Sequence, residues 1–260
     1  MMQKSKTQKP FLVLVHGLRG THHGLLSVAE GLKESFEVLT PDLPGSGENP
    51  ELDDKTLDGY AKWLHKYCTD LPEKPYIVGH SMGSIVVSHY VGKYPEDTQK
   101  KMALLSPIFR NKSGEKSSKF LYGALKAVLA PFPPKTKHKV MASRQVSYVI
   151  SHFLTHDKSK QKEIDELHYK YSGRFASAKS LLADAKISMT ETAIVPEGKQ
   201  VLLCVGTHDK LVDAEIVKVV AEKNQSRYKE IADVGHLLNY ERPEEVASVL
   251  EEFFLSNKTV

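Results

Sequence analysis

Three polar residues of this 260-residue chain could cooperate in nucleophilic catalysis: Ser81, Asp209 and His236. A serine hydroxyl is a poor nucleophile at neutral pH, so it needs a base within hydrogen-bond reach. An imidazole can be that base if a carboxylate holds its tautomer and stabilises its cationic form. The order serine, aspartate, histidine therefore predicts nucleophilic catalysis, provided that the fold brings the three side chains together.

Ser81 lies at the centre of a G-x-S-x-G motif, Gly79-His80-Ser81-Met82-Gly83. An apolar run at 76–79 precedes the motif, and an apolar helical pattern follows it from residue 84. A tight turn from strand to helix needs residues without side chains on both sides of its apex, because a Cβ there would clash. The serine would then project over the positive end of a helix, which suits a nucleophile.

Alternating strands and helices are predicted to position these residues. Strands are expected at 11–15, 37–40, 76–79, 101–105, 200–205 and 227–231, and helices at 22–36, 57–68, 84–94, 213–223 and 243–255. Strands separated by helices indicate a mostly parallel sheet of about six strands. Ligands of such sheets bind beyond the carboxyl ends of the strands, where Ser81, Asp209 and His236 all fall.

Residues 107–191 interrupt this alternation with helical patterning alone. Four helices are expected near 120–129, 142–154, 160–172 and 176–186, with a break at Pro131–Pro134. The segment carries 16 Lys and Arg against 7 Asp and Glu, a net charge of +9 in a chain whose total is +4. We therefore expect an α/β core formed by residues 1–106 and 192–260, with a helical insertion at 107–191.

The motifs together resemble the α/β-hydrolase fold family, in particular its capped serine hydrolases of the esterase and lysophospholipase kind. The resemblance rests on His16-Gly17-x-x-Gly20, Pro41-Asp-x-Pro-Gly-x-Gly47, Gly79-His-Ser-Met-Gly83, Gly206-x-x-Asp209 and Gly235-His236. It implies that Ser81 is the nucleophile, Asp209 the orienting acid and His236 the general base. It also implies that residues 107–191 form a cap over the site and that no cofactor is needed.

The same resemblance implies an oxyanion hole formed by the backbone N–H groups of Leu18 and Met82. Two features depart from the family pattern. No room exists before Phe11 for the usual N-terminal hairpin. Asp213 stands where a proline is common after the acid, which makes Asp213, a candidate helix cap, the main rival of Asp209.

Five residues are candidates for binding a substrate. Arg19, beside the expected oxyanion loop, could bind a carboxylate or phosphate bidentately, or could be a solvated side chain. His16 could contact substrate or hold its loop by hydrogen bonding. Phe120, Leu121 and Leu125 belong to an apolar stripe that either packs against the core or lines a site for an acyl chain.

Other ligands find little support in the sequence. His208 is expected to be a loop residue, and neither a Cys-x-x-Cys nor a His-Glu-x-x-His spacing predicts a metal site. The basic insertion could be a solvated surface or could attract anionic substrates or anionic lipid. Nucleic-acid binding is disfavoured because no aromatic-and-basic motif accompanies the charge.

The composition is ordinary for a globular protein, and no transmembrane helix is expected. No run of about 18 apolar residues occurs, and the apolar run after Pro10 is too short for a signal peptide, so a cytoplasmic protein is expected. Cys68 and Cys204 are expected to be reduced and structural.

The leading hypothesis is a serine hydrolase that cleaves a carboxylic ester of a small molecule or lipid through an acyl-enzyme on Ser81. Two alternatives use the same framework: a C–C bond hydrolase or acyltransferase with the same triad, and a non-catalytic ligand-binding or receptor protein. The filled triad positions disfavour the last alternative.

Overall fold

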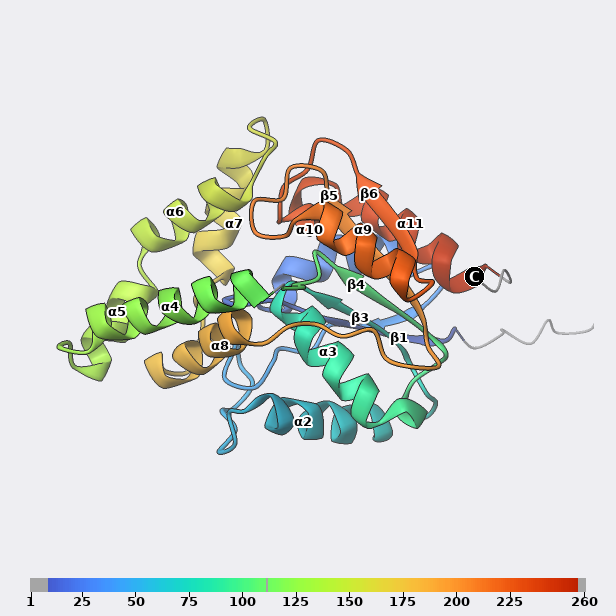
Figure 1. Ribbon diagram of the computed structural model, residues 1–260, viewed down its shortest axis with the longest axis horizontal. Helices are drawn as coiled ribbons and strands as arrows, with labels where there is room; N and C mark the ends of the chain where they lie inside the picture. Colours follow the sequence, from blue (N-terminus) through green and yellow to red (C-terminus); the bar gives the residue numbers. More distant parts are fainter. Residues whose placement is uncertain (1–8, 111, 257–260) are drawn as a thin grey trace, which may run out of the picture.

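The computed structural model describes residues 9–110 and 112–256, and within them six strands form one parallel sheet (Figure 1). The spatial order is β2-β1-β3-β4-β5-β6, and every neighbouring pair is parallel. This confirms the prediction of a mostly parallel sheet of about six strands. The strands are β1 (Phe11–Val15), β2 (Glu37–Leu39), β3 (Tyr76–His80), β4 (Lys101–Leu105), β5 (Gln200–Gly206) and β6 (Arg227–Ile231).

The central strands are apolar throughout because helices cover both faces of the sheet. In β1, Val13 and Val15 belong to one buried cluster, whereas Leu12 and Leu14 belong to the cluster on the opposite face. Successive side chains of a strand point to opposite faces, so a strand buried on both sides needs an unbroken apolar run.

Helices α2, α3 and α9 cover the face of the sheet that includes Val13, and α1 and α11 cover the other face. The predicted helix at 22–36 is shorter than expected. It begins as a 3-10 turn at His22–Leu25 and ends at Leu32, whose carbonyl accepts the N–H groups of both Ser35 and Phe36. The core helices are α1 (Leu26–Leu32), α2 (Leu57–Thr69), α3 (Met82–Lys93), α9 (Ala214–Lys223), α10 (Leu238–Glu241) and α11 (Pro243–Leu255), with a second 3-10 turn at Pro95–Asp97.

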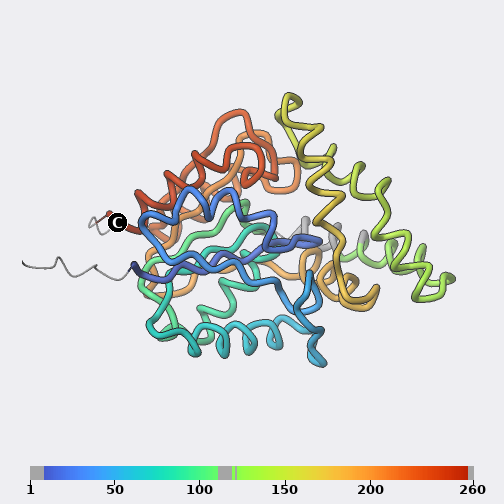
Figure 2. Tube along the Cα trace, turned by 180° about the vertical axis from the view of Figure 1, so that it is seen from behind, coloured from blue at the N-terminus to red at the C-terminus, as the bar shows by residue number. Residues whose placement is uncertain are grey.

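Five further helices lie between β4 and β5 in the chain: α4 (Lys112–Leu129), α5 (Pro134–Met141), α6 (Arg144–Leu154), α7 (Gln161–Tyr171) and α8 (Ala178–Thr190). They project from one end of the core, and the two ends of the described chain lie at the opposite end, as both views show (Figures 1 and 2). Helix α4 packs on α8, and α6 packs on α7. Across the described ranges, no helix has both the length and the apolarity needed to span a bilayer.

Candidate active site

Ser81 occupies a sharp turn between β3 and α3. Its backbone angles, φ 55° and ψ −122°, lie in a region that residues with side chains rarely adopt. The Ser81 N–H donates to the Leu105 carbonyl at 2.9 Å, and the Ser81 carbonyl accepts from the N–H and hydroxyl of Ser84 at 2.8 and 2.6 Å. These bonds hold the strained backbone and fix Ser81 at the carboxyl edge of the sheet.

The two glycines of the motif are required by close backbone contacts. A Cβ at Gly79 would lie 2.4 Å from the carbonyl oxygen of Gly83, and a Cβ at Gly83 would lie 2.5 Å from that of Val15. Both obstacles are backbone atoms, which cannot rotate away as a flexible side chain could. The motif therefore allows β1, β3 and the first turn of α3 to approach closely around Ser81.

The tertiary fold brings Ser81, His236 and Asp209 into one hydrogen-bonded chain. His236 Nε2 lies 2.8 Å from Ser81 Oγ, and His236 Nδ1 lies 2.8 Å from Asp209 Oδ2. A carboxylate can only accept, so Nδ1 carries the proton and Nε2 is left to accept the serine hydroxyl. This is the geometry that makes a serine hydroxyl nucleophilic.

Asp209 is held as an anion at the end of this chain. Its side chain is fully buried, and burial alone would raise its pKa. The adjacent His236 and the N–H groups of Leu211 and Val212, which donate to Oδ1 at 2.9 and 3.0 Å, lower it below the usual value of an aspartate. The rival Asp213 instead caps α9, accepting from the Glu215 N–H at 3.0 Å.

His80 supports the backbone of His236. Its Nε2 lies 3.0 Å from the His236 carbonyl oxygen, to which it donates, and burial lowers the pKa of His80 to about 4. The His236 N–H in turn donates to the carbonyl of Leu154, the last residue of α6. His80 is therefore neutral at pH 7 and holds a neighbouring loop.

The loop after β1 brings a second set of backbone N–H groups to the site. His16 is buried, its Nε2 accepts from the Leu43 N–H at 2.9 Å, and its Nδ1 donates to the Gly17 carbonyl. His16 thus holds its own loop, although its ring also lines the cavity described next. The N–H groups of Leu18 and Met82, the predicted oxyanion donors, donate to no other residue in the described part of the chain.

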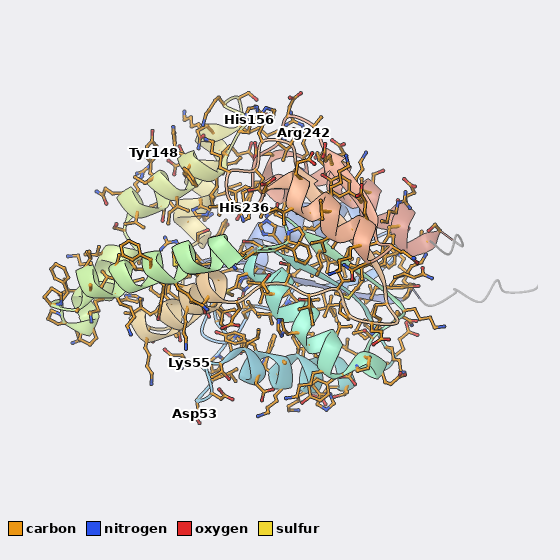
Figure 3. All side chains as sticks on the ribbon, viewed as in Figure 1. Asp53, Lys55, Tyr148, His156, His236 and Arg242 are labelled. Atoms are coloured by element: carbon orange, nitrogen blue, oxygen red, sulfur yellow. The ribbon has the colours of Figure 1, made fainter. Side chains whose placement is uncertain are left out.

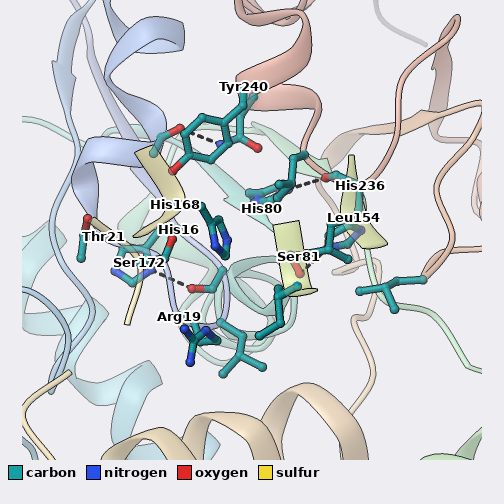
Figure 4. Close-up of a pocket in the computed structure, with 18 of the residues that line it drawn as sticks. His16, Arg19, Thr21, His80, Ser81, Leu154, His168, Ser172, His236 and Tyr240 are labelled. Atoms are coloured by element: carbon teal, nitrogen blue, oxygen red, sulfur yellow. Dashed lines mark hydrogen bonds between the residues drawn. The ribbon is translucent and has the colours of Figure 1, made fainter. Parts of the chain in front are cut away.

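A cavity of about 340 Å³ opens over Ser81 between the core and the inserted helices (Figure 4). Its core side includes Ser81, His236 and the loop of Leu18. Its opposite wall comes from α6, with Phe153 and Leu154 among the lining residues. The predicted nucleophile therefore faces a partly open and largely apolar cavity.

Arg19 lies in the wall of this cavity and is buried, with 8% of its surface exposed, which excludes a solvated side chain. Its guanidinium donates to the Met141 carbonyl and, at 3.1 Å, to Ser147 Oγ, both of the inserted segment. Burial lowers the pKa of Arg19 to about 10. Among the described residues it forms no ion pair, and its Nε has no hydrogen-bond partner.

Of the two roles expected for the apolar stripe, packing against the core or lining an acyl-chain site, the described residues do not support the lining role. Phe120 is 76% exposed, and neither Phe120 nor Leu125 lines the cavity. The apolar stripe of α4 packs partly on α8 and otherwise faces outward. The side chain of Leu121 lies outside the described part of the structure.

The apolar wall comes instead from α6, which sequence reasoning missed. The signal was present, because Val149, Ile150 and Phe153 recur at helical spacing within a segment already predicted to be a helix. His168 and Asn239 were also missed. They line the cavity from α7 and α10, and no local pattern distinguishes these two residues from the other polar residues of the same helices.

Comparisons with known proteins identify the family of this chain. The sequence model of the alpha/beta hydrolase fold family matches residues 10–243. Monoacylglycerol lipase ABHD6 of Homo sapiens is 30% identical over 151 residues, which are 54% of this chain and 44% of that protein. The match thus spans less than half the length of that curated relative.

Solved structures show the same fold. A thermophilic esterase from Thermogutta terrifontis has a TM-score of 0.74 at 21% identity, covering 95% of this chain and 90% of the esterase. A 2-hydroxy-6-oxo-6-phenylhexa-2,4-dienoate hydrolase from Rhodococcus sp. strain RHA1 has a TM-score of 0.66 at 21% identity, covering 95% and 91%. The motif resemblance, the parallel sheet and the family match agree, and the chain belongs to the alpha/beta hydrolase fold family.

Proposed function

We propose that this protein is a serine hydrolase that cleaves carboxylic esters through an acyl-enzyme on Ser81. The observation that carries the proposal is the hydrogen-bonded chain from Ser81 through His236 to Asp209, with both links at 2.8 Å, at the wall of the cavity. The match to a monoacylglycerol lipase supports an ester of a lipid or small molecule as substrate.

In this mechanism His236 Nε2 takes the proton of Ser81 as Oγ attacks the ester carbonyl. The buried carboxylate of Asp209 stabilises the imidazolium that forms. His236 then returns the proton to the departing alcohol, which leaves the acyl group on Ser81. A water molecule, activated by the same imidazole, hydrolyses this acyl-enzyme and restores the serine.

The negative charge of the tetrahedral intermediate falls on the former carbonyl oxygen. The N–H groups of Leu18 and Met82 are proposed to stabilise it, because both belong to segments that flank Ser81 and neither has another described acceptor. Met82 is also the first residue of α3, so the positive end of that helix adds to the stabilisation.

Residues 107–191 are proposed to act as a cap that selects substrates. Side chains of α6 form the wall opposite Ser81. Val149, Phe153 and Leu211 line the cavity yet are 66%, 50% and 55% exposed, so an apolar surface leads from solvent into the site. An alkyl or acyl chain could enter along this surface and bury its apolar area in the cavity.

Arg19 gives a reason to expect an anionic group on the substrate. The cavity wall contains three buried polar atoms without a described partner: Arg19 Nε, His168 Nδ1 and Asn239 Oδ1. A buried guanidinium with no carboxylate beside it is costly, and a substrate carboxylate or phosphate would supply the missing counter-charge. We propose that Arg19 binds this group while the ester reaches Ser81.

Labelling with a fluorophosphonate probe tests the proposal, since the probe reacts only with an activated serine. We expect the wild type and the Ser172→Ala variant to be labelled, because Ser172 lines the same cavity away from the hydrogen-bonded chain. Ser81→Ala should lose labelling and about 10⁵-fold or more of 4-nitrophenyl ester hydrolysis. Full hydrolysis by Ser81→Ala, or an unlabelled but folded wild type, would refute the proposal.

Product analysis separates ester hydrolysis from acyl transfer on the same triad. Incubation with an ester and a competing alcohol should yield the free carboxylic acid as main product. A dominant new ester would instead establish acyl transfer.

A further inference from the structure

Three side chains from separate loops converge outside the cavity, at the border between the inserted helices and the core. They are His156 between α6 and α7, His208 after β5, and Asp233 after β6. One ligand atom from each lies within 4.8 Å of the other two. We propose that these residues bind a divalent transition-metal ion of the zinc class.

The potential ligand atoms are free to bind a cation. Neither ring nitrogen of His156 nor the carboxylate of Asp233 is engaged by any other described residue through a hydrogen bond or ion pair. The two imidazoles stack with centroids 3.7 Å apart and planes 11° apart. Their apposition therefore rests on contact between the rings, and among the described residues neither imidazole forms an ion pair with an acid.

Thr207 orients two of the three ligands. Its Oγ1 lies 3.0 Å from His208 Nδ1 and accepts the Asp233 N–H, also at 3.0 Å. When Nδ1–H donates to this oxygen, the lone pair of His208 is on Nε2. Histidines that bind metals usually donate their other ring N–H in this way, which fixes tautomer and ring orientation.

The loop that carries His156 is held in place without an ion. The fully buried carboxylate of Glu241 accepts from the N–H groups of His156, Asp157 and Gly235 at 2.9, 2.6 and 3.0 Å. Arg242 pairs with Asp157 at 2.6 Å, which leaves Asp157 out of the ligand set. Figure 3 shows His156 beside Arg242 where this loop meets the core.

The other two loops are joined directly, because the His208 N–H donates to the Val234 carbonyl at 2.9 Å. Ligands of a tetrahedral zinc ion lie about 3.3 Å apart when each bond is about 2.0–2.1 Å. The ligand atoms of the three side chains now lie within 4.8 Å of one another. Rotations of the side chains that tilt the two stacked rings would have to bring these atoms closer to bind the ion. The three loops are already held by the hydrogen bonds described above, so the backbone of the site is organised before the ion arrives.

The ligand types select the class of ion. Imidazole nitrogens suit zinc, nickel and copper, whereas calcium and magnesium prefer sets of oxygen ligands. Two histidines and one carboxylate leave a fourth position of a tetrahedral zinc open to water, consistent with the exposure of His208 and Asp233.

A bound ion would connect the inserted segment to both loops of the hydrogen-bonded chain. His208 directly precedes Asp209, and Asp233 lies three residues before His236, whereas His156 follows α6, which forms the cavity wall. The ion would therefore restrain α6 relative to Ser81. This inference concerns binding and does not depend on the proposed ester hydrolysis.

Isothermal titration of the full chain, without a histidine tag and after treatment with a chelator, tests the site. We expect saturable binding of one Zn²⁺ by the wild type and no comparable binding of Mg²⁺. His156→Ala, His208→Ala and Asp233→Asn should each weaken Zn²⁺ binding by about 10-fold or more. His65→Gln is the matched control, since His65 lies on α2 and pairs with Asp97, and should bind like the wild type.

Two further readouts show whether the ion sits at this place. Co²⁺ in the wild type should give the intense visible absorption of a tetrahedral site, and His208→Ala should lose it. At about 100-fold excess over the dissociation constant, Zn²⁺ should raise the melting temperature by on the order of 5 °C in the wild type and His65→Gln. The inference fails if the wild type binds no Zn²⁺, or if His156→Ala and His208→Ala bind it as tightly as the wild type.

Discussion

Replacing Asp209 with asparagine tests whether a carboxylate is needed at the end of the hydrogen-bonded chain. Oδ1 of Asp209 accepts two backbone N–H groups, from Leu211 and Val212. In Asp209→Asn the amide oxygen must keep these donors, so the NH₂ group faces His236 Nδ1. That nitrogen must then accept, which places the imidazole proton on Nε2, opposite the Ser81 hydroxyl.

In this tautomer His236 cannot take the serine proton, although every heavy atom can stay in place. Loss of the correct tautomer in a catalytic serine triad costs about 10⁴-fold in kcat, or about 5.4 kcal/mol of transition-state stabilisation. The folded state loses one charged hydrogen bond of a buried pair, so thermal stability should change far less than activity.

The assay is steady-state hydrolysis of a 4-nitrophenyl ester, with a melting curve for each variant. Asp213→Asn is the matched control. Its amide oxygen can still cap α9, and its side chain lies outside the hydrogen-bonded chain, so activity should stay within about twofold. Activity of Asp209→Asn within tenfold of the wild type, or an equal loss in Asp213→Asn, would refute the reasoning.

Three other substitutions test the turn at Ser81, the cavity and the buried core. Gly83→Ala places a Cβ 2.5 Å from the Val15 carbonyl oxygen and should abolish fluorophosphonate labelling, with a lower melting temperature; a stable and labelled variant would contradict the packing argument. Arg19→Gln should lower kcat/KM for the anionic ester 4-nitrophenyl hemiglutarate by about 10-fold or more relative to kcat/KM for the neutral 4-nitrophenyl hexanoate. The reason is that a hydrogen bond to a charged group contributes about 1.5–3 kcal/mol. If the ratio of the two kcat/KM values is unchanged, Arg19 does not bind an anionic group of the substrate. Burial raises the pKa of Asp184 from its ordinary 3.8 to about 7. Between these two pH values the folded state keeps a proton that the unfolded state has released. The free energy of unfolding therefore falls as the pH rises through this range. Asp184→Asn, which can still accept from Tyr60, should flatten this slope in urea titrations from pH 4 to 8; a slope equal to that of the wild type would show that other groups cause it.

The strands were predictable because local sequence determines them. The prediction for Lys101–Leu105 has the bounds of β4, and Arg227–Ile231 those of β6. The apolar run of β4 has few other ways to be buried on both faces, whereas β6 is an edge strand of mostly polar residues that is only partly buried. The sharp turn at Ser81 was predictable for a related reason, since only glycine tolerates the contacts at residues 79 and 83.

The surroundings of Arg19 and α4 were not predictable in this way. Whether Arg19 is solvated depends on Met141 and Ser147, which lie more than 120 residues away in the sequence. The stripe of α4 and the stripe of α6 have the same helical period, and only the packing of the inserted helices decides that α6 faces Ser81.

The sequence by itself determined the order of the three candidate catalytic residues along the chain. They are a serine in a glycine-flanked turn, an aspartate and a histidine, and each follows a predicted strand. Parallel strands end at a common edge, so this order predicted that the three side chains lie near one another, and the family resemblance implied their roles. Only the tertiary structure decided which inserted helix faces Ser81, that Arg19 is buried without an ion-pair partner among the described residues, and that His156, His208 and Asp233 meet. Those arrangements join loops and helices that are distant in sequence, and no local spacing encodes contacts that depend on how whole elements pack.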